Sequence, residues 1–484
     1  MWWFEAIRPK EPLPYLTEEH LRPILRRAKD LASMFAAFAL NAGDPRKAVE
    51  VIEHAHGISV VQLAQYRTTL DKLHASSPEL LSELLDLSSQ LQQANSEERG
   101  DSAECIDVSW WDSVGSHLDL SKRWNDVLAR IRNLPGFEAF LKPTPLETLQ
   151  HAAAQGPVII INVTHLRSDA IIILKSGEPA VIALPKATPD AIKGLLDTPM
   201  EGTATWPALN GSLRTKLQNI WTVIVAPIVY YLERTLRLPH RSRIWWNPTT
   251  AVCSLPLHAA QTSIPHELSL PDRFVSSYTP SLSSLLRSDM PAMGTFGPDL
   301  LLVADAANSI GVTDIIPPGL PARITVMEDA NSTRDAMLAG LKDSTWVHFT
   351  NDNCCLAKDS FISTILFPSQ RTKPLTFLDI VHNDLPKAEM AFLSVGHSAY
   401  GDDANNLAVG MLHSGFRSVI GSMWGISDED KFVVARAFYK HMYRNGLEAA
   451  DYRDAAMALS MATKDLIRKG VPLERWVNFV HYGM

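Results

Sequence analysis

Short apolar runs alternate with helical patterns in the second half of the chain, and this alternation limits the possible folds more than any other feature. We expect four buried strands there, at residues 299–303, 347–349, 390–395 and 417–423. Helices are expected beside them, at residues 333–341, 404–413, 428–442 and 452–468. Strands joined through helices run parallel, because each connection crosses one face of the sheet. The sequence therefore predicts an α/β fold with a mostly parallel sheet flanked by helices.

An earlier α/β block precedes this part, so the α/β region looks duplicated. Its expected strands lie at residues 158–163, 170–174, 180–184 and 243–246. We accordingly divide the chain into a helical region at 1–150, a first α/β subdomain at 151–290 and a second at 291–484.

The helical region begins with two amphipathic patterns. Residues 17–40 form the first, with Thr17 as the expected N-cap, and residues 46–65 form the second after the stop at Asn41-Ala-Gly-Asp-Pro45. Such a pair is one unit of a tetratricopeptide-type array. No further copy follows, and a solenoid needs about three repeats to bury its faces. We therefore expect a tetratricopeptide-like cap on the α/β region.

The composition describes an ordinary globular protein of 484 residues, with 46% hydrophobic and 20% charged residues. A net charge of −8 offers no basic surface for a nucleic-acid backbone, so no nucleic-acid partner is expected. Four irregularly spaced cysteines suit neither a disulfide framework nor a zinc site, which favours a reducing compartment, and we expect the cytoplasm. The N-terminus lacks a signal-peptide pattern, and the longest apolar run, residues 220–232, is too short to span a membrane. We expect no cofactor and no metal.

Two expected strands end in loops of small and polar residues, and in such sheets chemistry is found where strands end. The segments are Trp346-Val-His-Phe-Thr-Asn-Asp-Asn353 and Ala391-Phe-Leu-Ser-Val-Gly-His-Ser398. They resemble the two signature motifs of CHAT domains, caspase-like (C14-like) cysteine peptidases of the same clan as separase and metacaspases. Family members typically read V-H-F-A-C-H-G at the first motif and F-L-S-A-C-x-T at the second. The second histidine of the first motif is their general base, and the cysteine of the second motif is their nucleophile.

The resemblance extends from about residue 40 to residue 484. Further segments look like family landmarks, at residues 156–163, 245–249, 255–260, 275–280, 415–420, 423–430 and 474–483. Residues 47–65 also resemble the last repeat before the peptidase region in fungal tetratricopeptide–CHAT proteins. The resemblance implies a caspase-like fold with an N-terminal helical cap.

When the family motifs are aligned with this sequence, other residues occupy the two catalytic positions. Asp352 stands at the base position and Gly396 at the nucleophile position. Glycine has no side chain for covalent catalysis, and an aspartate shuttles protons near neutral pH only if its pKa rises by several units. The sequence therefore predicts a non-catalytic pseudopeptidase that binds a protein or peptide. The expected cleft is formed by His348, Asp352, Asp359, Gly396, His397 and Asp402.

Other chemistry in the same cleft remains open at this point. Cys354 or Cys355 with His397 would form a dyad whose members have exchanged loops. Ser398 stands in a segment similar to a nucleophile elbow and would support a serine hydrolase. An acid/base or divalent-metal cleft would form if Asp352 lay with His397, Asp402 and Asp403. A tailoring enzyme of a small-molecule pathway is a further alternative. Asp359 would favour a basic peptide if it lay at the floor of a pocket. The sequence does not indicate the oligomeric state.

Overall fold

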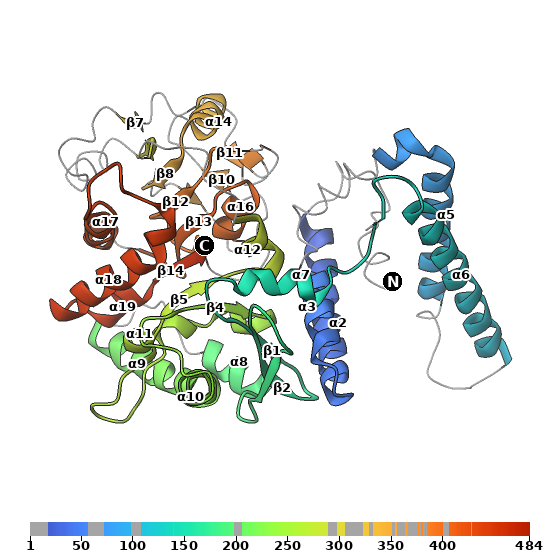
Figure 1. Ribbon diagram of the computed structural model, residues 1–484, viewed down its shortest axis with the longest axis horizontal. Coiled ribbons are helices and arrows are strands. Elements are labelled where there is room, and N and C mark those ends of the chain that lie inside the picture. Colours follow the sequence, from blue (N-terminus) through green and yellow to red (C-terminus); the bar gives the residue numbers. More distant parts are fainter. Residues whose placement is uncertain are drawn as a thin grey trace. The chain divides into compact units, whose positions relative to one another are not determined.

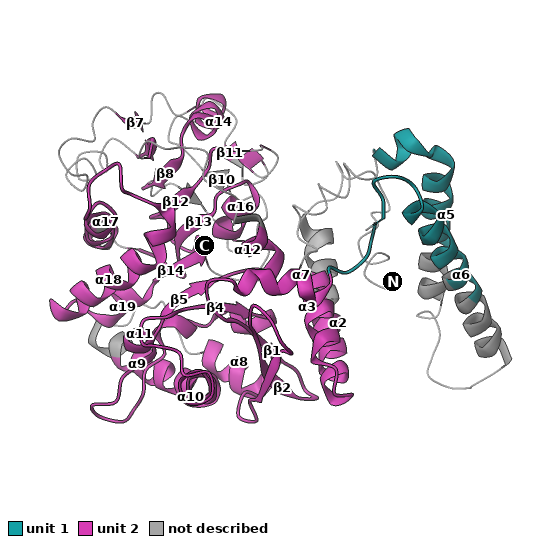
Figure 2. Cartoon of the chain, viewed as in Figure 1, with its two compact units in different colours: residues 1–28, 58–144 teal, residues 29–57, 145–484 magenta. Residues whose placement is uncertain are grey.

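The computed structural model describes most of the chain in two compact units. The described residues are 18–56, 72–97, 108–138, 140–197, 206–288, 298–304, 323–328, 333–350, 354–355, 364–365, 375–376, 379–380, 383, 385–399, 406–426 and 428–484. The first unit covers residues 1–28 and 58–144, and the second covers residues 29–57 and 145–484 (Figure 2). Among the described residues, no helix is both long and apolar enough to cross a membrane.

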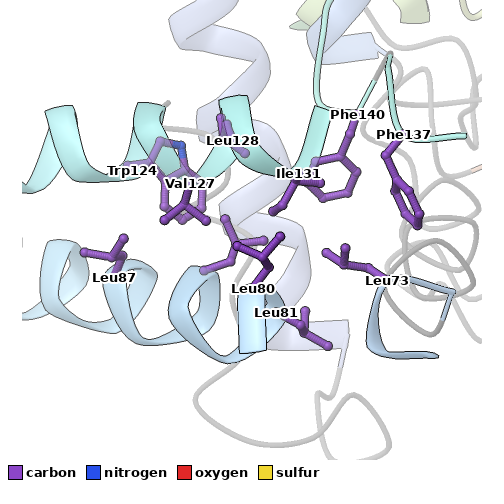
Figure 3. Close-up of a cluster of buried hydrophobic side chains, with 11 residues drawn as sticks. Leu73, Leu80, Leu81, Leu87, Trp124, Val127, Leu128, Ile131, Phe137 and Phe140 are labelled. Carbon is purple, nitrogen blue, oxygen red and sulfur yellow. The ribbon is translucent and has the colours of Figure 1, made fainter. Parts of the chain in front are cut away.

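The first unit is built on a helical hairpin, α5 (Pro78–Glu97) and α6 (Val108–Arg132). Leu84 and Leu87 of α5 pack with Trp124 and Val127 of α6 in one buried cluster. Figure 3 shows Leu87, Trp124 and Val127 among its members. These residues recur at three- and four-residue spacing, so each helix presents one apolar stripe to the other. The hairpin therefore has a hydrophobic core of its own.

The second unit contains an eleven-stranded sheet, in the order β3-β2-β1-β4-β5-β14-β13-β12-β8-β6-β7. The strands on one side are β1 (Val158–Val163), β2 (Ser168–Ile173), β3 (Ala180–Ala183), β4 (Arg243–Pro248) and β5 (Val275–Tyr278). Those on the other side are β6 (Leu300–Val303), β7 (Ile324–Met327), β8 (Trp346–Phe349), β12 (Met390–Leu393) and β13 (Ser418–Ser422), with β14 (Phe479–Gly483) between the two sides. Most neighbouring strands are parallel, and helices flank the sheet (Figure 1), as the strand–helix alternation predicted.

The helices of the second unit lie between these strands in the chain. After β3 come α8 (Pro189–Asp197), α9 (Trp206–Ile220), α10 (Ala226–Arg234) and α12 (Leu282–Ser288). Beyond β7 come α14 (Arg334–Asp343), α16 (Leu407–His413), α17 (Asp428–Met442), α18 (Ala455–Arg468) and α19 (Leu473–Val477). Helix α18 covers β5 and β14 and packs against α19 (Figure 1), which places it over the middle of the sheet.

Strand β14 joins the two halves of the sheet, since it pairs parallel with β5 and antiparallel with β13. The sequence analysis did not predict this strand. His481 lies at its centre, and its ring bonds the hydroxyls of Ser277 on β5 at 2.9 Å and Ser418 on β13 at 2.8 Å. Burial, followed by the charge of Arg243, holds the pKa of His481 well below its usual value. A neutral imidazole therefore links three adjacent strands.

Helices α2 (Glu18–Asn41, from Lys29 onward) and α3 (Pro45–His56) belong to the second unit. Ser33 accepts a bond through its carbonyl from the Asn162 side chain at 2.9 Å. The buried Glu53 carboxylate accepts the backbone N–H groups of Leu282 and Ser283 at 2.8 and 2.9 Å. These donors lie in the first turn of α12, where helix N–H groups have no partner within the helix and an anion is favoured. The helical pair is thus anchored to the α/β fold by a capping carboxylate.

Replacing His481→Leu should lower the free energy of unfolding by about 2 kcal/mol or more, because the buried hydroxyls of Ser277 and Ser418 each lose a hydrogen bond. Urea unfolding at pH 7 would measure the loss. His151→Leu is the matched control, since His151 is exposed, and its effect should stay within about 0.5 kcal/mol. Equal effects at both positions would contradict the proposed role of His481.

Candidate functional site

Strands β8 and β12 are adjacent and parallel, with Phe349 opposite Leu393. This pairing confirms that the two signature segments end at the same edge of the sheet. Three positions beyond that pair along each segment stand Asp352 and Gly396. Asp352 lies outside the described residues, as do Asp359 and Asp402, so the structure places Gly396 but not these three carboxylates.

Gly396 is partly exposed and lies against the loop that follows β13. A Cβ atom built on Gly396 would stand 3.1 Å from Cα of Gly425 and 3.7 Å from the carbonyl oxygen of Trp424. A separation of 3.1 Å is shorter than ordinary van der Waals contact between carbon atoms. The backbone of the neighbouring loop therefore occupies the direction in which a side chain at residue 396 would point.

The loop at residues 424–426 is fixed in this place by Asn478, the residue that follows α19. The Asn478 amide oxygen accepts the backbone N–H of Trp424 at 2.8 Å. Its amide nitrogen donates to the carbonyls of Trp424 and Gly425, each at 3.1 Å. A single side chain satisfies three backbone groups of the loop, so the loop has little freedom to withdraw from Gly396.

His397 completes the contact between the two loops. Its backbone N–H donates to the carbonyl of Trp424 at 3.3 Å. The residue has a φ of 61°, a left-handed conformation that few residues other than glycine adopt and that costs on the order of 1 kcal/mol. Its side chain is partly exposed beside Gly396. Among the sequence-predicted site residues that the structure describes, His397 is thus the one that brings an imidazole to the surface.

Ser398 faces the interior of the protein. It is fully buried, and its hydroxyl oxygen accepts the backbone N–H of Ser422 at 2.9 Å. Its other hydroxyl contacts are the Leu393 carbonyl and the Ser422 hydroxyl, each at 3.5 Å. A hydrolytic serine needs a base within hydrogen-bond reach and access to substrate, and the burial and these contacts of Ser398 provide neither. Its hydroxyl instead fastens β12 to β13.

His348 lies in the core beneath the strand ends. One ring nitrogen bonds the Ser394 hydroxyl at 2.9 Å and the other bonds the Tyr439 hydroxyl at 3.2 Å. The ring centroid lies 4.6 Å from that of Phe392. Burial lowers the pKa of His348 to about 3, so the ring is neutral at physiological pH. This histidine holds strands β8 and β12 to α17 and does not open onto a cleft.

Cys354 and Cys355 form strand β9 (Cys354–Cys355), which pairs antiparallel with β10 (Thr364–Ile365). With β11 (Leu375–Thr376) these strands make a separate three-stranded sheet. The structure describes the backbone of the two cysteines but not their side chains, so the exchanged dyad with His397 remains a prediction.

Within the described residues, no group of three or more histidine, cysteine or acidic side chains could hold a metal ion. The carboxylates of the predicted acidic cleft lie outside those residues. The functional features that sequence reasoning missed are Asn478 and the loop at residues 424–426. Asn478 lies in a segment already noted as a landmark, but its role as a loop clamp depends on contacts across 54 positions of sequence.

The fold and this edge of the sheet define an α/β protein whose candidate site lies where two parallel strands end. The model of the CHAT domain family matches residues 214–484, which is more than half of the chain. The chain belongs to the CHAT family.

Two solved structures of the Saccharomyces cerevisiae separase–securin complex are similar to this chain. They have 14% and 15% sequence identity and TM-scores of 0.34 and 0.33. Each match covers 84% of this chain and only 27% of the other chain. Comparison with curated proteins finds no match.

Gly396→Ala should lower the free energy of unfolding by about 1 kcal/mol or more, because the added methyl group must push against the Gly425 backbone. Gly194→Ala is the matched control. Gly194 lies in α8 with open space around the Cβ position, so alanine there should stabilise by about 0.4–1 kcal/mol. Chemical denaturation measures both variants, and a stabilising effect at Gly396 would contradict the close contact between the loops.

The stability of the protein should fall as the pH drops below ~6.5, the pKa of histidine in an unfolded chain. His348 has a folded pKa of about 3, so its neutral form is favoured by folding. This contribution is present above pH ~6.5 and is lost as the pH falls toward the folded pKa, by about 1.4 kcal/mol per pH unit.

His348→Asn should destabilise the protein at pH 7. It should also make the free energy of unfolding less dependent on pH, by about 1.4 kcal/mol per pH unit, the contribution of one proton. Urea unfolding between pH 7 and 5 measures both effects. The same change at the exposed His151 should leave the slope as in the wild type. An unchanged slope in the His348 variant would show that the ring is not held neutral.

Proposed function

We propose that this CHAT protein is a non-catalytic pseudopeptidase that binds a protein or peptide partner. The binding surface includes the partly exposed Gly396 and His397 together with Gly425 and Ile426 of the neighbouring loop. We also propose a cytoplasmic location, which the few, irregularly spaced cysteines favour.

One observation carries the proposal, namely the backbone of Gly425 at 3.1 Å from the Cβ position of Gly396. Restoring a nucleophile would require more than a single change of side chain, since the loop would also have to move. Asn478 opposes such a movement through its three hydrogen bonds to that loop. The site thus has the fixed backbone surface that binding requires and lacks the side chain that covalent chemistry requires.

The neighbouring hydroxyl and imidazole groups support the same conclusion. Ser398 and His348 are both buried and hydrogen-bonded within the core. Neither is in a position to activate a substrate or water at the surface. The imidazole that does reach the surface is that of His397, and a partly exposed ring beside two glycines suits contact with an extended peptide.

Peptides selected from a display library for binding to the wild-type protein should be bound but not cleaved. Ile426→Asp should abolish their binding, because a charge would enter the centre of the surface formed by the two loops. Lys193→Asp provides the control, since Lys193 is an exposed side chain of α8, and it should bind as the wild type does. Fluorescence anisotropy measures binding, and mass spectrometry of the incubated peptides measures cleavage.

Thiol-dependent cleavage by the wild type would overturn this proposal in favour of a repurposed enzyme. Loss of that cleavage in Cys354→Ala, Cys355→Ala or His397→Ala would identify the exchanged dyad. Cleavage that survives all three changes would point to other chemistry, including a tailoring reaction. The double variant Asp352→His with Gly396→Cys should yield at most a trace of cleavage, because the loop at 424–426 crowds the new cysteine.

A further inference from the structure

A cavity of about 50 Å³ lies between the sheet and helix α18, among side chains that the proposed site does not use. Strands β5 and β14 and helices α18 and α19 contribute most of its lining residues. Its walls are mostly apolar and include Phe274, Leu459, Trp476 and Phe479. The cavity is half-open, so a group from outside can enter it.

The volume of the cavity restricts what can bind. Pockets for cofactors and drug-sized ligands measure about 300–1,000 Å³, whereas one water needs about 10–15 Å³. A cavity of about 50 Å³ therefore excludes a nucleotide or a cofactor and accepts one aliphatic side chain. Ser276, Ser460 and Thr463 also line it, which places hydroxyl groups beside the apolar wall.

The side chain of His258, which lines the cavity, is uncharged, and both of its ring nitrogens are hydrogen-bonded. His258 bonds the Tyr278 hydroxyl at 3.0 Å through one ring nitrogen and the Val477 carbonyl at 2.9 Å through the other. Burial lowers the pKa of His258 to about 4, so the ring is neutral. The wall offers no charge for a ligand, and the interior of the cavity favours an apolar group.

Cations lie on and against helix α18, which lines the cavity, in a protein whose net charge is −8. The exposed Arg241 places its guanidinium against the sulfur atoms of Met457 and Met461, at 3.2 and 2.7 Å, on α18. Lys464 directly follows the cavity residue Thr463. Lys464 stands three residues after Met461 on α18, so it shares the helix face that Arg241 contacts. Burial, then the charges of Arg241 and Arg468, lower the pKa of Lys464.

Carboxylates balance this charge only in part. Asp272 is the acidic group that raises the pKa of Lys464. Asp465 also lies on α18, but it bonds His441 at 3.1 Å and Arg468 at 3.3 Å. Arg241 and Lys464 therefore leave a cationic rim beside an apolar cavity, which is the arrangement that an acidic chain with one apolar anchor complements.

We propose that this cavity and its rim, formed by Arg241, Lys464 and the α18 face, bind an acidic peptide segment through one aliphatic side chain. The aliphatic group enters the cavity, and carboxylates on either side of it lie near the two cations. This surface is separate in its residues from the loops at Gly396 and Gly425, so the inference does not depend on the proposed function.

The test uses fluorescein-labelled seven-residue peptides with three glutamates on each side of a central glycine, valine, leucine or tryptophan. In low salt, the valine and leucine peptides should bind the full-length protein at least fivefold more tightly than the glycine peptide. The tryptophan peptide should bind no more tightly than the glycine peptide, because the indole ring is too large for the cavity. A valine peptide with lysine in place of glutamate should not bind, and added salt should weaken the acidic peptides.

Two variants separate the roles of charge and cavity. Arg241→Glu with Lys464→Glu should weaken binding of the valine peptide at least tenfold. Lys186→Glu with Lys193→Glu makes an equal change in net charge and should leave the affinity unchanged. Ser460→Leu fills the cavity and should remove the advantage of valine over glycine. Thermal melts establish that each variant is folded, and Ile426→Asp should leave this binding intact.

Three outcomes would overturn the inference. These are equal binding of the valine and glycine peptides, equal binding of the acidic and basic peptides, or no binding of any peptide up to about 1 mM. None of them bears on the display-selected peptides at the Gly396 loops, so failure here and failure of the proposed function remain distinguishable.

Discussion

The insertion of β14 between β5 and β13 is the constraint on which the second unit depends. Without this strand the two half-sheets would each present an unpaired central edge, and exposed edges invite wrong pairing. The three-strand linkage through His481 adds side-chain specificity to backbone pairing, because its two ring nitrogens bond Ser277 on one neighbouring strand and Ser418 on the other. Asn478 immediately precedes β14, so the placement of this strand also fixes the clamp on the loop beside Gly396.

Polar groups near the candidate site serve the scaffold more than they serve chemistry. His348, Ser394 and Tyr439 form one buried chain of hydrogen bonds, and Ser398 and Ser422 form another. Both chains tie neighbouring elements together just below the strand ends. Such networks are costly when one member is missing, so they make the strand ends rigid. Rigid strand ends present the two loops as a fixed surface, as the proposed binding function requires.

The sequence predicted the parallel core because its strands are continuous apolar runs, and β1, β8 and β12 lie where such runs occur. It did not predict β14, since residues such as Asn478 and His481 interrupt the apolar pattern for reasons visible only across the sheet. The apolar run at 220–232 lies in one continuous helix, in which α9 passes through a π-helical turn at Trp221–Val225 into α10. The π-helical turn lies just before Pro227, which has no N–H to continue the regular α-helical hydrogen bonds. Gly396 was identified from the motif, but its contact with Gly425 requires knowing how distant loops meet.

The Glu53 cap on α12 has a consequence for how this protein can be divided. The family match begins at residue 214, which falls inside α9, and a fragment cut there would start in mid-helix. It would also lack β1, the neighbour of β4, and the carboxylate that satisfies the first amides of α12. The segment shared with the family is therefore not an autonomous folding unit in this chain. The boundary of the family match and the boundary of the folded unit therefore differ here, and a shortened chain would have to keep α2, α3 and β1 to retain these contacts.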